Sequence, residues 1–194
     1  MHVTAKFVKL LFVVALVAVS SACGEFTREG RAPVVLVVDS LIVGDDEQGT
    51  LLSDVITKNS TFNDMAEVEM RLILKDPGPP GVTVGPSLLN AVTITRYRVE
   101  YRRSDGRNTQ GVDVPYSFDS ALTFTVPSDG SATGVFQLVR HAAKEEAPLK
   151  ALANNLDIIS TIAYVTFYGH DQAGNDVSAT ATIGVDFGNF ADPQ

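Results

Sequence analysis

Hydrophobic and polar residues alternate along much of the chain, in segments separated by turn-forming residues. In residues 177–187 (VSATATIGVDF), Val, Ala, Ile and Phe occupy every second position, while Ser, Thr and Asp occupy most of the others. Residues 66–75 (AEVEMRLILK) repeat the pattern with Val68, Met70, Leu72 and Leu74. Because successive side chains of a strand point to opposite faces of a sheet, both segments are predicted to be half-buried strands.

Six further segments have the composition of strands between turn-rich breaks. They are residues 33–43, 51–57, 91–103, 120–126, 134–140 and 157–168. Eight strands with little helix predict an all-β fold, in which the strands form an antiparallel sandwich. The apolar phase of residues 91–103 (AVTITRYRVEYRR) changes between Ile94 and Tyr97, which predicts a β-bulge.

One short helix is predicted between residues 145 and 156. Two glutamates precede Pro148, which is tolerated in the first turn of a helix. Leu149, Leu152 and Leu156 then approximate one helical face. We expect this helix to close one end of the sandwich.

The first 22 residues have the three parts of an export signal. Residues 1–9 carry two lysines and no acid, residues 10–19 are uniformly apolar, and three small residues (Ser-Ser-Ala) follow. A transmembrane anchor is the alternative, but it needs about 20 apolar residues, and Lys9 limits the uninterrupted run to well under that. Residues 1–22 are therefore predicted to be a removable signal peptide.

Cys23, the only cysteine of the chain, follows this segment directly. Residues 1–24 resemble the signal of bacterial lipoproteins (the lipobox), in which the chain is cleaved before a cysteine whose thiol receives a diacylglycerol. The resemblance implies lipidation at Cys23, although Ser20 stands where that family usually has leucine. Ser20 and Ala22 also fit the small-x-small rule of ordinary signal peptidase, and cleavage by that enzyme would release a soluble protein.

The lipoprotein resemblance also implies a location in the cell envelope. Two or three acyl chains anchor a protein permanently, because each buried methylene contributes about 0.8 kcal/mol. In Gram-negative lipoproteins an aspartate after the cysteine favours the inner membrane, and this chain has Gly24 there. We therefore expect an outer-membrane lipoprotein facing the periplasm, with residues 23–32 as a lipidated tether and residues 33–190 as a single domain.

The mature chain is acidic. Removal of residues 1–22 takes two of the 15 basic residues and none of the 23 acidic ones, which leaves 13 basic residues against 23 acidic ones. This charge disfavours non-specific binding to nucleic acid, and no nucleic-acid partner is predicted. The length is sufficient for a hydrophobic core without disulfide bonds.

Residues 164–183 (YVTFYGHDQAGNDVSATATI) resemble the closing hairpin of bacterial immunoglobulin-like and fibronectin-III-like domains, in which a D-x-A-G-N turn joins two strands. The matching residues are Asp171, Ala173, Gly174 and Asn175. Gly174 and Asn175 tolerate the positive φ of a tight turn, and Asp171 can accept backbone amide protons. The resemblance implies an immunoglobulin-like sandwich with an adhesive or scaffolding role. The helix and a proline-rich segment depart from a minimal domain of this kind, so a larger sandwich variant is the alternative.

The sequence contains no recognisable catalytic motif, and we predict neither enzymatic activity nor a cofactor. His141 and His170 lie about thirty residues apart, without a nucleophile motif near either. Calcium is an alternative, because residues 45–47 and the turn at residues 171–176 offer oxygen ligands. The spacing of an EF-hand is absent, and Asp and Asn are common in turns, so no metal site is predicted.

Residues 96–107 (RYRVEYRRSDGR) form a basic cluster in this acidic chain. Its arginines are Arg96, Arg98, Arg102, Arg103 and Arg107. The first three share one face of a predicted strand. Through bidentate contacts this candidate binding face could hold phosphate, carboxylate or an acidic partner. The alternative is a solvated sheet face that neighbouring acids neutralise.

Residues 77–86 (PGPPGVTVGP) contain four prolines and three glycines. Proline cannot donate to a central strand ladder, so this segment is predicted to be an exposed, semi-rigid loop between strands. A rigid loop loses little entropy on binding, which makes it a candidate for partner recognition. An ordinary long connection is the alternative.

These features predict a lipid-anchored structural or protein-interaction module of the cell envelope, without catalytic activity, that binds the membrane through its anchor and an envelope protein through its folded domain. The alternative is a module for carbohydrate or another small ligand, with the arginine face or an end loop as its site. Sugar sites commonly present exposed aromatic rings, and this chain has no Trp and five Tyr. The absence of Trp makes the sugar alternative weaker.

Overall fold

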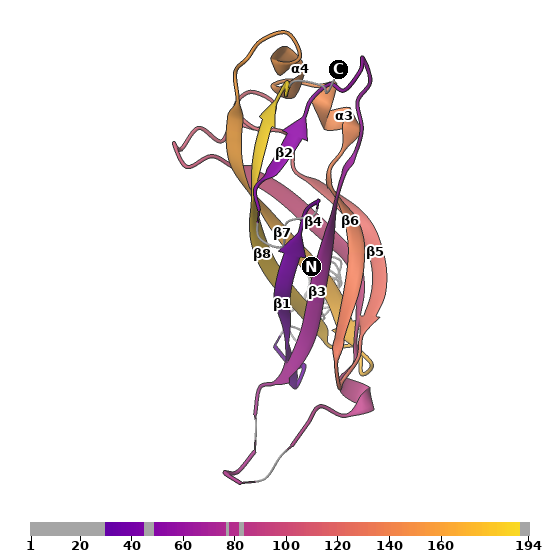
Figure 1. The fold of residues 1–194 in the computed structure, drawn as a ribbon. Coiled ribbons are helices and arrows are strands. Elements are labelled where there is room, and N and C mark those ends of the chain that lie inside the picture. The colour runs from indigo at the N-terminus through magenta and orange to yellow at the C-terminus, as the bar shows by residue number, and fades with distance from the viewer. Residues whose placement is uncertain (1–29, 45–48, 77, 82–83, 191–194) are drawn as a thin grey trace, which may run out of the picture.

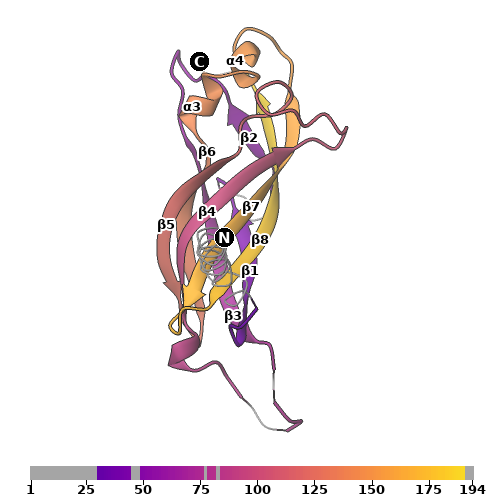
Figure 2. The same ribbon diagram turned by 180° about the vertical axis from the view of Figure 1, so that it is seen from behind.

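Eight β-strands form two facing sheets in the computed structural model, which describes residues 30–44, 49–76, 78–81 and 84–190 (Figure 1). The three-stranded sheet has the order β1 (Val34–Ile42), β3 (Asp64–Leu74), β6 (Ser131–Val139). The five-stranded sheet has the order β2 (Leu51–Asp54), β8 (Asp176–Gly188), β7 (Ile159–Asp171), β4 (Val92–Arg102), β5 (Phe118–Val126). It curls into a half-barrel (Figure 2). Each strand overlaps a predicted segment, so the all-β prediction is confirmed.

Neighbouring strands are antiparallel with one exception among the described residues. β2 runs parallel to β8, with Leu51 opposite Val185 and Asp54 opposite Gly188. β1 and β2 point in the same direction although they belong to different sheets (Figure 1). An alternating pattern reports which face of a strand is buried but not which strand is its neighbour. The antiparallel prediction is therefore wrong for this pair.

The core lies between the sheets and follows the predicted alternation. In β3 and β8, the buried apolar side chains are those of Ala66, Val68, Met70, Leu72, Ile183, Val185 and Phe187, and Leu74 is half-buried. The remaining apolar positions of β8 that were predicted to face inward, Val177, Ala179 and Ala181, are half-buried against this core. The alternating pattern thus identified the correct inner face of each strand.

Two tyrosines of β4 connect the sheets. The hydroxyl of Tyr97 donates to the backbone carbonyl of Gln137 on β6 at 3.0 Å and accepts from the backbone amide of Gln137 at 3.2 Å. The hydroxyl of Tyr101 donates to the carbonyl of Leu138 at 2.5 Å. Burial raises the pKa of both phenols, because the interior disfavours the ionised form. Both hydroxyls therefore act as neutral donors that fix β6 over β4.

The predicted bulge in β4 is confirmed. Against β7 the register shifts between Ile94 and Arg96 because β4 has one extra residue, Thr95, and against β5 the register shifts at the same place because β5 has one extra residue. The extra residue in β4 allows Ile94 and Tyr97 to be buried together although they are three residues apart. Gly169 lies opposite Ile94 in β7, and a Cβ there would overlap the carbonyl oxygen of Thr93.

The structure has two short helices where one was predicted: α4 (Leu149–Leu152) lies within the predicted range of residues 145–156, and α3 (His141–Lys144) precedes it and was not predicted. The two helices are separated by residues 145–148. Pro148 has no amide proton and disfavours a helical conformation in the residue before it, which prevents one continuous helix. Leu149 and Leu152, two of the three leucines predicted to share a helical face, are buried, but Leu156 lies beyond α4 and is 93% exposed.

The elongated molecule has two distinct ends (Figure 1). We call one the loop end. It comprises residues 30–33, the described part of the β3–β4 loop (residues 75–76, 78–81 and 84–91), and the turns at residues 127–130 and 171–175. The amide of Lys75 donates to the carbonyl of Pro33 at 2.9 Å, which places the beginning of the described chain at this end. The other, the helix end, carries α3 and α4.

Candidate functional site

The predicted lipidation site, Cys23, lies outside the described residues, as do the tether up to residue 29 and the acidic run at residues 45–47. Within the part of the chain that is described, no helix has the length and apolar character needed to cross a bilayer. Lipidation and tethering thus stay predictions.

Three predicted binding-face residues lie together on the outer surface of β4. The guanidinium groups of Arg96 and Arg98 both contact Asp119 of β5, at 3.1 and 2.6 Å. Arg102 contacts Glu100 of the same strand at 2.8 Å. Each of these cations already has a carboxylate partner, as expected of a neutralised sheet face.

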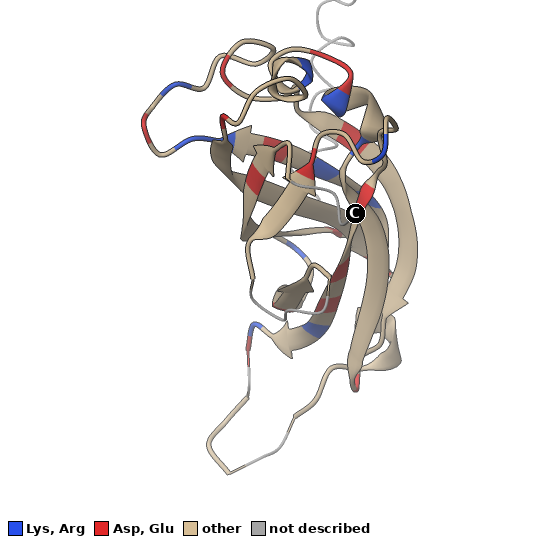
Figure 3. Ribbon diagram, turned by 45° about the horizontal axis from the view of Figure 1, so that its top comes forward, with Lys and Arg blue, Asp and Glu red and all other residues tan. Residues whose placement is uncertain are grey.

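Arg103 and Arg107 are separate from this face, because they lie in the loop between β4 and β5. Both contact Asp105, at 2.7 and 3.1 Å. Hydrogen bonds from Arg103 and from the backbone and side chain of Arg107 hold the pKa of the Asp105 carboxyl well below its ordinary value. Charges of both signs alternate along this loop (Figure 3). The five arginines therefore form two acid-paired groups and not one basic surface.

Two tyrosine rings on the outer face of β7 are covered by arginines. The guanidinium of Arg96 lies 3.8 Å from the centre of the Tyr168 ring, and that of Arg102 lies 4.7 Å from the centre of the Tyr164 ring. These are cation–π contacts, in which the cation occupies one face of each ring. A sugar could stack on these covered faces only after the guanidinium groups had moved.

The predicted turn joins β7 to β8. Asp171 is 1% exposed, and its carboxylate accepts hydrogen bonds from the amides of Ala173 and Asn175 at 2.9 and 2.8 Å. The side chain of Asn175 donates a further bond at 2.8 Å, and Gly174 has a φ of +79°. Burial alone raises the pKa of Asp171, but these donors together lower it below its ordinary value. The carboxylate therefore serves to stabilise the turn.

The two histidines in the described part of the chain lie far apart. His141 begins α3 at the helix end, where its amide and Nδ1 contact the side-chain oxygen of Asn63. His170 is exposed near the loop end, and its Nδ1 lies 3.1 Å from the carbonyl of Asp171. No group of three or more potential metal ligands occurs among the described residues.

The sheet order leaves a pair of free strand edges, a feature that was not predicted from the sequence. β1 pairs only with β3, and β8 pairs with β2 only over Val185–Gly188. Residues 176–184 of β8 thus have β7 on one side and, within the described chain, no strand on the other. β1 lies beside this free edge. We call the surface between them the β1–β8 groove.

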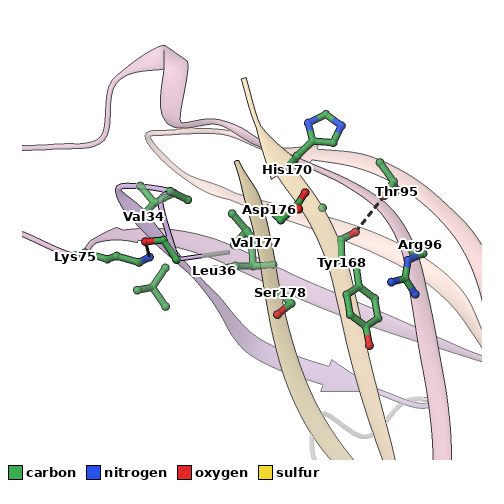
Figure 4. Close-up of a pocket in the computed structure, with 14 residues that line it drawn as sticks. Val34, Leu36, Lys75, Thr95, Arg96, Tyr168, His170, Asp176, Val177 and Ser178 are labelled. Carbon is green, nitrogen blue, oxygen red and sulfur yellow. Dashed lines mark hydrogen bonds between the residues drawn. The ribbon is translucent and has the colours of Figure 1, made fainter. Parts of the chain in front are cut away.

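Two hollows follow one another along the β1–β8 groove. The one near the loop end has a volume of about 620 Å³. Figure 4 shows its apolar side chains Val34, Leu36 and Val177 beside the polar side chains of Arg96, Tyr168 and other residues. The second has a volume of about 390 Å³ and is lined by residues 38–41, 49–50 and 181–184. Together they extend along both free edges.

One sequence signal points weakly to this arrangement. Residues 33–38 (PVVLVV) are apolar at consecutive positions, unlike the alternating strands. Val34 and Leu36 are buried, whereas Val35 is 43% exposed. A strand with apolar residues on both faces is typical of an element with more than one neighbouring surface.

A buried ion pair at the helix end was also not predicted from the sequence. Lys144 of α3 is 3% exposed, and its ammonium lies 3.0 Å from the Asp64 carboxylate and 2.8 Å from the carbonyl of Asp54. The hydroxyl of Ser53 donates to the same carboxylate at 2.6 Å. Ser53 is fully buried, so this cluster joins α3 to the sheets and offers no accessible nucleophile.

No known protein family matches the chain, and no curated protein is similar to it. Among solved structures, the chain is similar to the solution structure of a protein described as late embryogenesis abundant. The two share 11% sequence identity with a TM-score of 0.39, over 93% of this chain and 86% of the other. A likeness of this degree gives no information about function.

Proposed function

We propose that the protein is a non-catalytic interaction module of the cell envelope, anchored through lipid on Cys23 to the outer membrane on its periplasmic side and built on an immunoglobulin-like sandwich. Two facing sheets and the D-x-A-G-N hairpin between β7 and β8 support the immunoglobulin-like assignment. The position of Cys23 directly behind the apolar segment supports the anchor.

The observation that carries the proposal is the β1–β8 groove. The backbone amide and carbonyl groups on a free strand edge can pair with an extended segment of another protein, and pockets beside the edge can accept its side chains. Here two such edges and two hollows lie together. The partner in this proposal is an envelope protein that adds an extended segment to the groove.

Co-purification from native membranes in mild detergent tests the anchor and the partner together. The mature wild-type protein should carry a lipid-sized mass at its N-terminus and bring a stoichiometric partner. Cys23→Ser should lose the lipid and, with it, the high local concentration that favours the partner. A wild-type protein that is unlipidated and without a partner would contradict the proposal.

A pair of groove variants tests the site. Thr182 is an exposed residue of β8 in the groove, and Thr123 is an exposed residue of β5 at the opposite edge of the same sheet. Thr182→Glu should remove the partner from the purified complex, because it introduces a charge where a strand would dock. Thr123→Glu is the matched control and should retain the partner.

The larger hollow favours a second candidate function, the binding of a carbohydrate or another small ligand. Its volume of about 620 Å³ lies within the usual range of ligand sites, and its lining is both apolar and polar. Arg96 lines this hollow and Arg98 does not, although both contact Asp119. Saturable binding in a glycan panel that Arg96→Ala abolishes and Arg98→Ala preserves would establish this function.

A further inference from the structure

The β3–β4 loop and the start of β4 carry no charged residue over a long stretch. Between Asp76 and Arg96 lie nineteen positions, residues 77–95, without Asp, Glu, Lys or Arg, in a chain of which 20% is charged. In Figure 3, the described residues of this loop are tan beyond the charged residues at its start. A surface segment of this composition is unusual in an acidic protein.

Large apolar side chains are exposed in the same loop. Leu88 and Leu89 are 83% and 69% exposed, and Val84 is 48% exposed. Single exposed apolar residues are common on protein surfaces, but adjacent ones in an uncharged segment form a patch that indicates a binding surface.

The two leucines are held outward by hydrogen bonds of their own segment. They begin a single 3-10 turn, η1 (Leu88–Asn90), in which the side-chain oxygen of Asn90 accepts from the amide of Ser87 at 2.7 Å. The carbonyl of Leu89 accepts from the amide of Gln172 in the β7–β8 turn at 3.3 Å. Leu88 and Leu89 are therefore fixed to the sandwich.

This patch lies at the end of the molecule where the described chain begins. Gly30 is in contact with the base of the loop, because the ammonium of Lys75 donates to its carbonyl at 3.1 Å. Cys23 and Gly30 are seven positions apart, and that length of chain spans at most about 25 Å. A lipid on Cys23 would keep the loop end within that distance of the bilayer.

We propose that the β3–β4 loop makes a second contact with the membrane, in which Leu88, Leu89 and Val84 enter the interfacial layer of the lipid surface. The inference rests on the proposed anchor, which supplies the proximity. Burial of one leucine side chain shifts the partition of the loop from water to the lipid surface by roughly tenfold or more. This contact is weak by itself, but it is sufficient to orient a protein that is already anchored to the membrane. The absence of acidic groups from residues 77–95 avoids repulsion from anionic headgroups. The sandwich then stands with its helix end away from the membrane.

Tryptophan fluorescence in reconstituted vesicles tests this orientation, because the chain contains no natural Trp. The full mature protein carries Leu88→Trp and is placed in phosphatidylethanolamine–phosphatidylglycerol vesicles with or without brominated acyl chains. Leu156→Trp is the matched control, since Leu156 is 93% exposed at the helix end. We expect a blue shift and bromine quenching for Leu88→Trp, neither for Leu156→Trp, and loss of the Leu88→Trp quenching when Leu89→Asp is added.

Equal quenching at both positions, or quenching at neither, would overturn the inference. A blue shift at Leu88→Trp without quenching would also overturn it, because it would indicate a protein surface in place of lipid. The mass of the mature N-terminus, measured on the same sample, reports separately on the anchor. If that mass shows no lipid, the proposed function fails. The loop contact is then tested by the same quenching comparison, made with the unlipidated protein and added vesicles.

Discussion

Asn175 donates two hydrogen bonds to the carboxylate of Asp171, one from its backbone amide and one from its side-chain amide, both at 2.8 Å. The carboxylate is almost completely buried at the tip of the β7–β8 hairpin. The relationship explains why these two residue types occupy the ends of the D-x-A-G-N segment: a buried carboxylate is tolerated only where donors surround it.

Asp171→Ala should lower the free energy of unfolding by about 1–3 kcal/mol, because the amides around the carboxylate lose a charged acceptor. Chemical denaturation monitored by circular dichroism measures this change. Asp129→Ala, at an exposed position in the β5–β6 turn, is the control and should change stability by less than about 0.5 kcal/mol.

The same carboxylate makes stability depend on pH. The pKa of Asp171 is lowered in the folded protein relative to about 3.9 in an unfolded chain. The ionised carboxylate therefore stabilises the fold above about pH 4, and this contribution is lost as the pH falls through that value toward the folded pKa. Between about pH 5 and pH 3, Asp171→Ala should lose less stability than the wild type. Parallel losses in both proteins would contradict the assigned role.

Gly169→Ala should destabilise the fold more than Gly174→Ala. A Cβ at Gly169 would overlap backbone atoms of Thr93 at the bulge of β4, and backbone cannot move aside as a side chain can. We expect a loss of about 3 kcal/mol at this position, at the upper end of overpacking effects. A Cβ at Gly174 meets no atom, and the strain of a positive φ alone contributes about 1 kcal/mol. Thermal unfolding measures the loss of stability in both variants. A larger loss for Gly174→Ala than for Gly169→Ala would show that the close approach of Gly169 to Thr93 is unimportant.

The features that were predictable from sequence are those set by neighbours within one segment. The alternation around Val68 and Val185 identified strands and their buried faces, and the phase change after Ile94 identified the bulge, because side-chain direction follows residue spacing. The D-x-A-G-N turn could be predicted because its hydrogen bonds join residues within one short segment. Pro148 was correctly placed at the start of a helix, because it directly precedes α4, but the second helix before it was not predicted.

The features that were missed depend on which strands become neighbours. Asp119 neutralises Arg98 from the adjacent strand, 21 residues along the chain, and no local pattern relates them. The parallel pairing of β2 with β8 and the free edges of the β1–β8 groove are likewise set by tertiary packing. A pattern of strands thus predicted the fold class, while the candidate site required the order of strands in each sheet.

Lys144→Ala should lower the free energy of unfolding by about 3–5 kcal/mol, because it leaves the carboxylate of Asp64 without its buried cation. Arg71→Ala is the matched control, since it removes the cation of the Arg71–Asp39 pair, whose side chains are 48% and 27% exposed. Solvent screens such a pair, and its loss should change stability by less than about 1 kcal/mol. Similar effects of the two substitutions in denaturant titrations would show that the Lys144 pair is screened as well.

Asp119→Ala should convert part of the sheet surface into an anion-binding face. In the wild type, Asp119 contacts both Arg96 and Arg98 at the surface, so its removal frees two neighbouring cations and changes stability by less than about 1 kcal/mol per pair. We expect stronger retention on an anionic column, with the gain lost at high salt because exposed charges are screened. Glu100→Ala frees Arg102 alone and should give a smaller gain. If the wild type were already retained strongly and Asp119→Ala changed nothing, the arginines would be available for binding despite their acidic partners, and the original binding-face interpretation would be favoured.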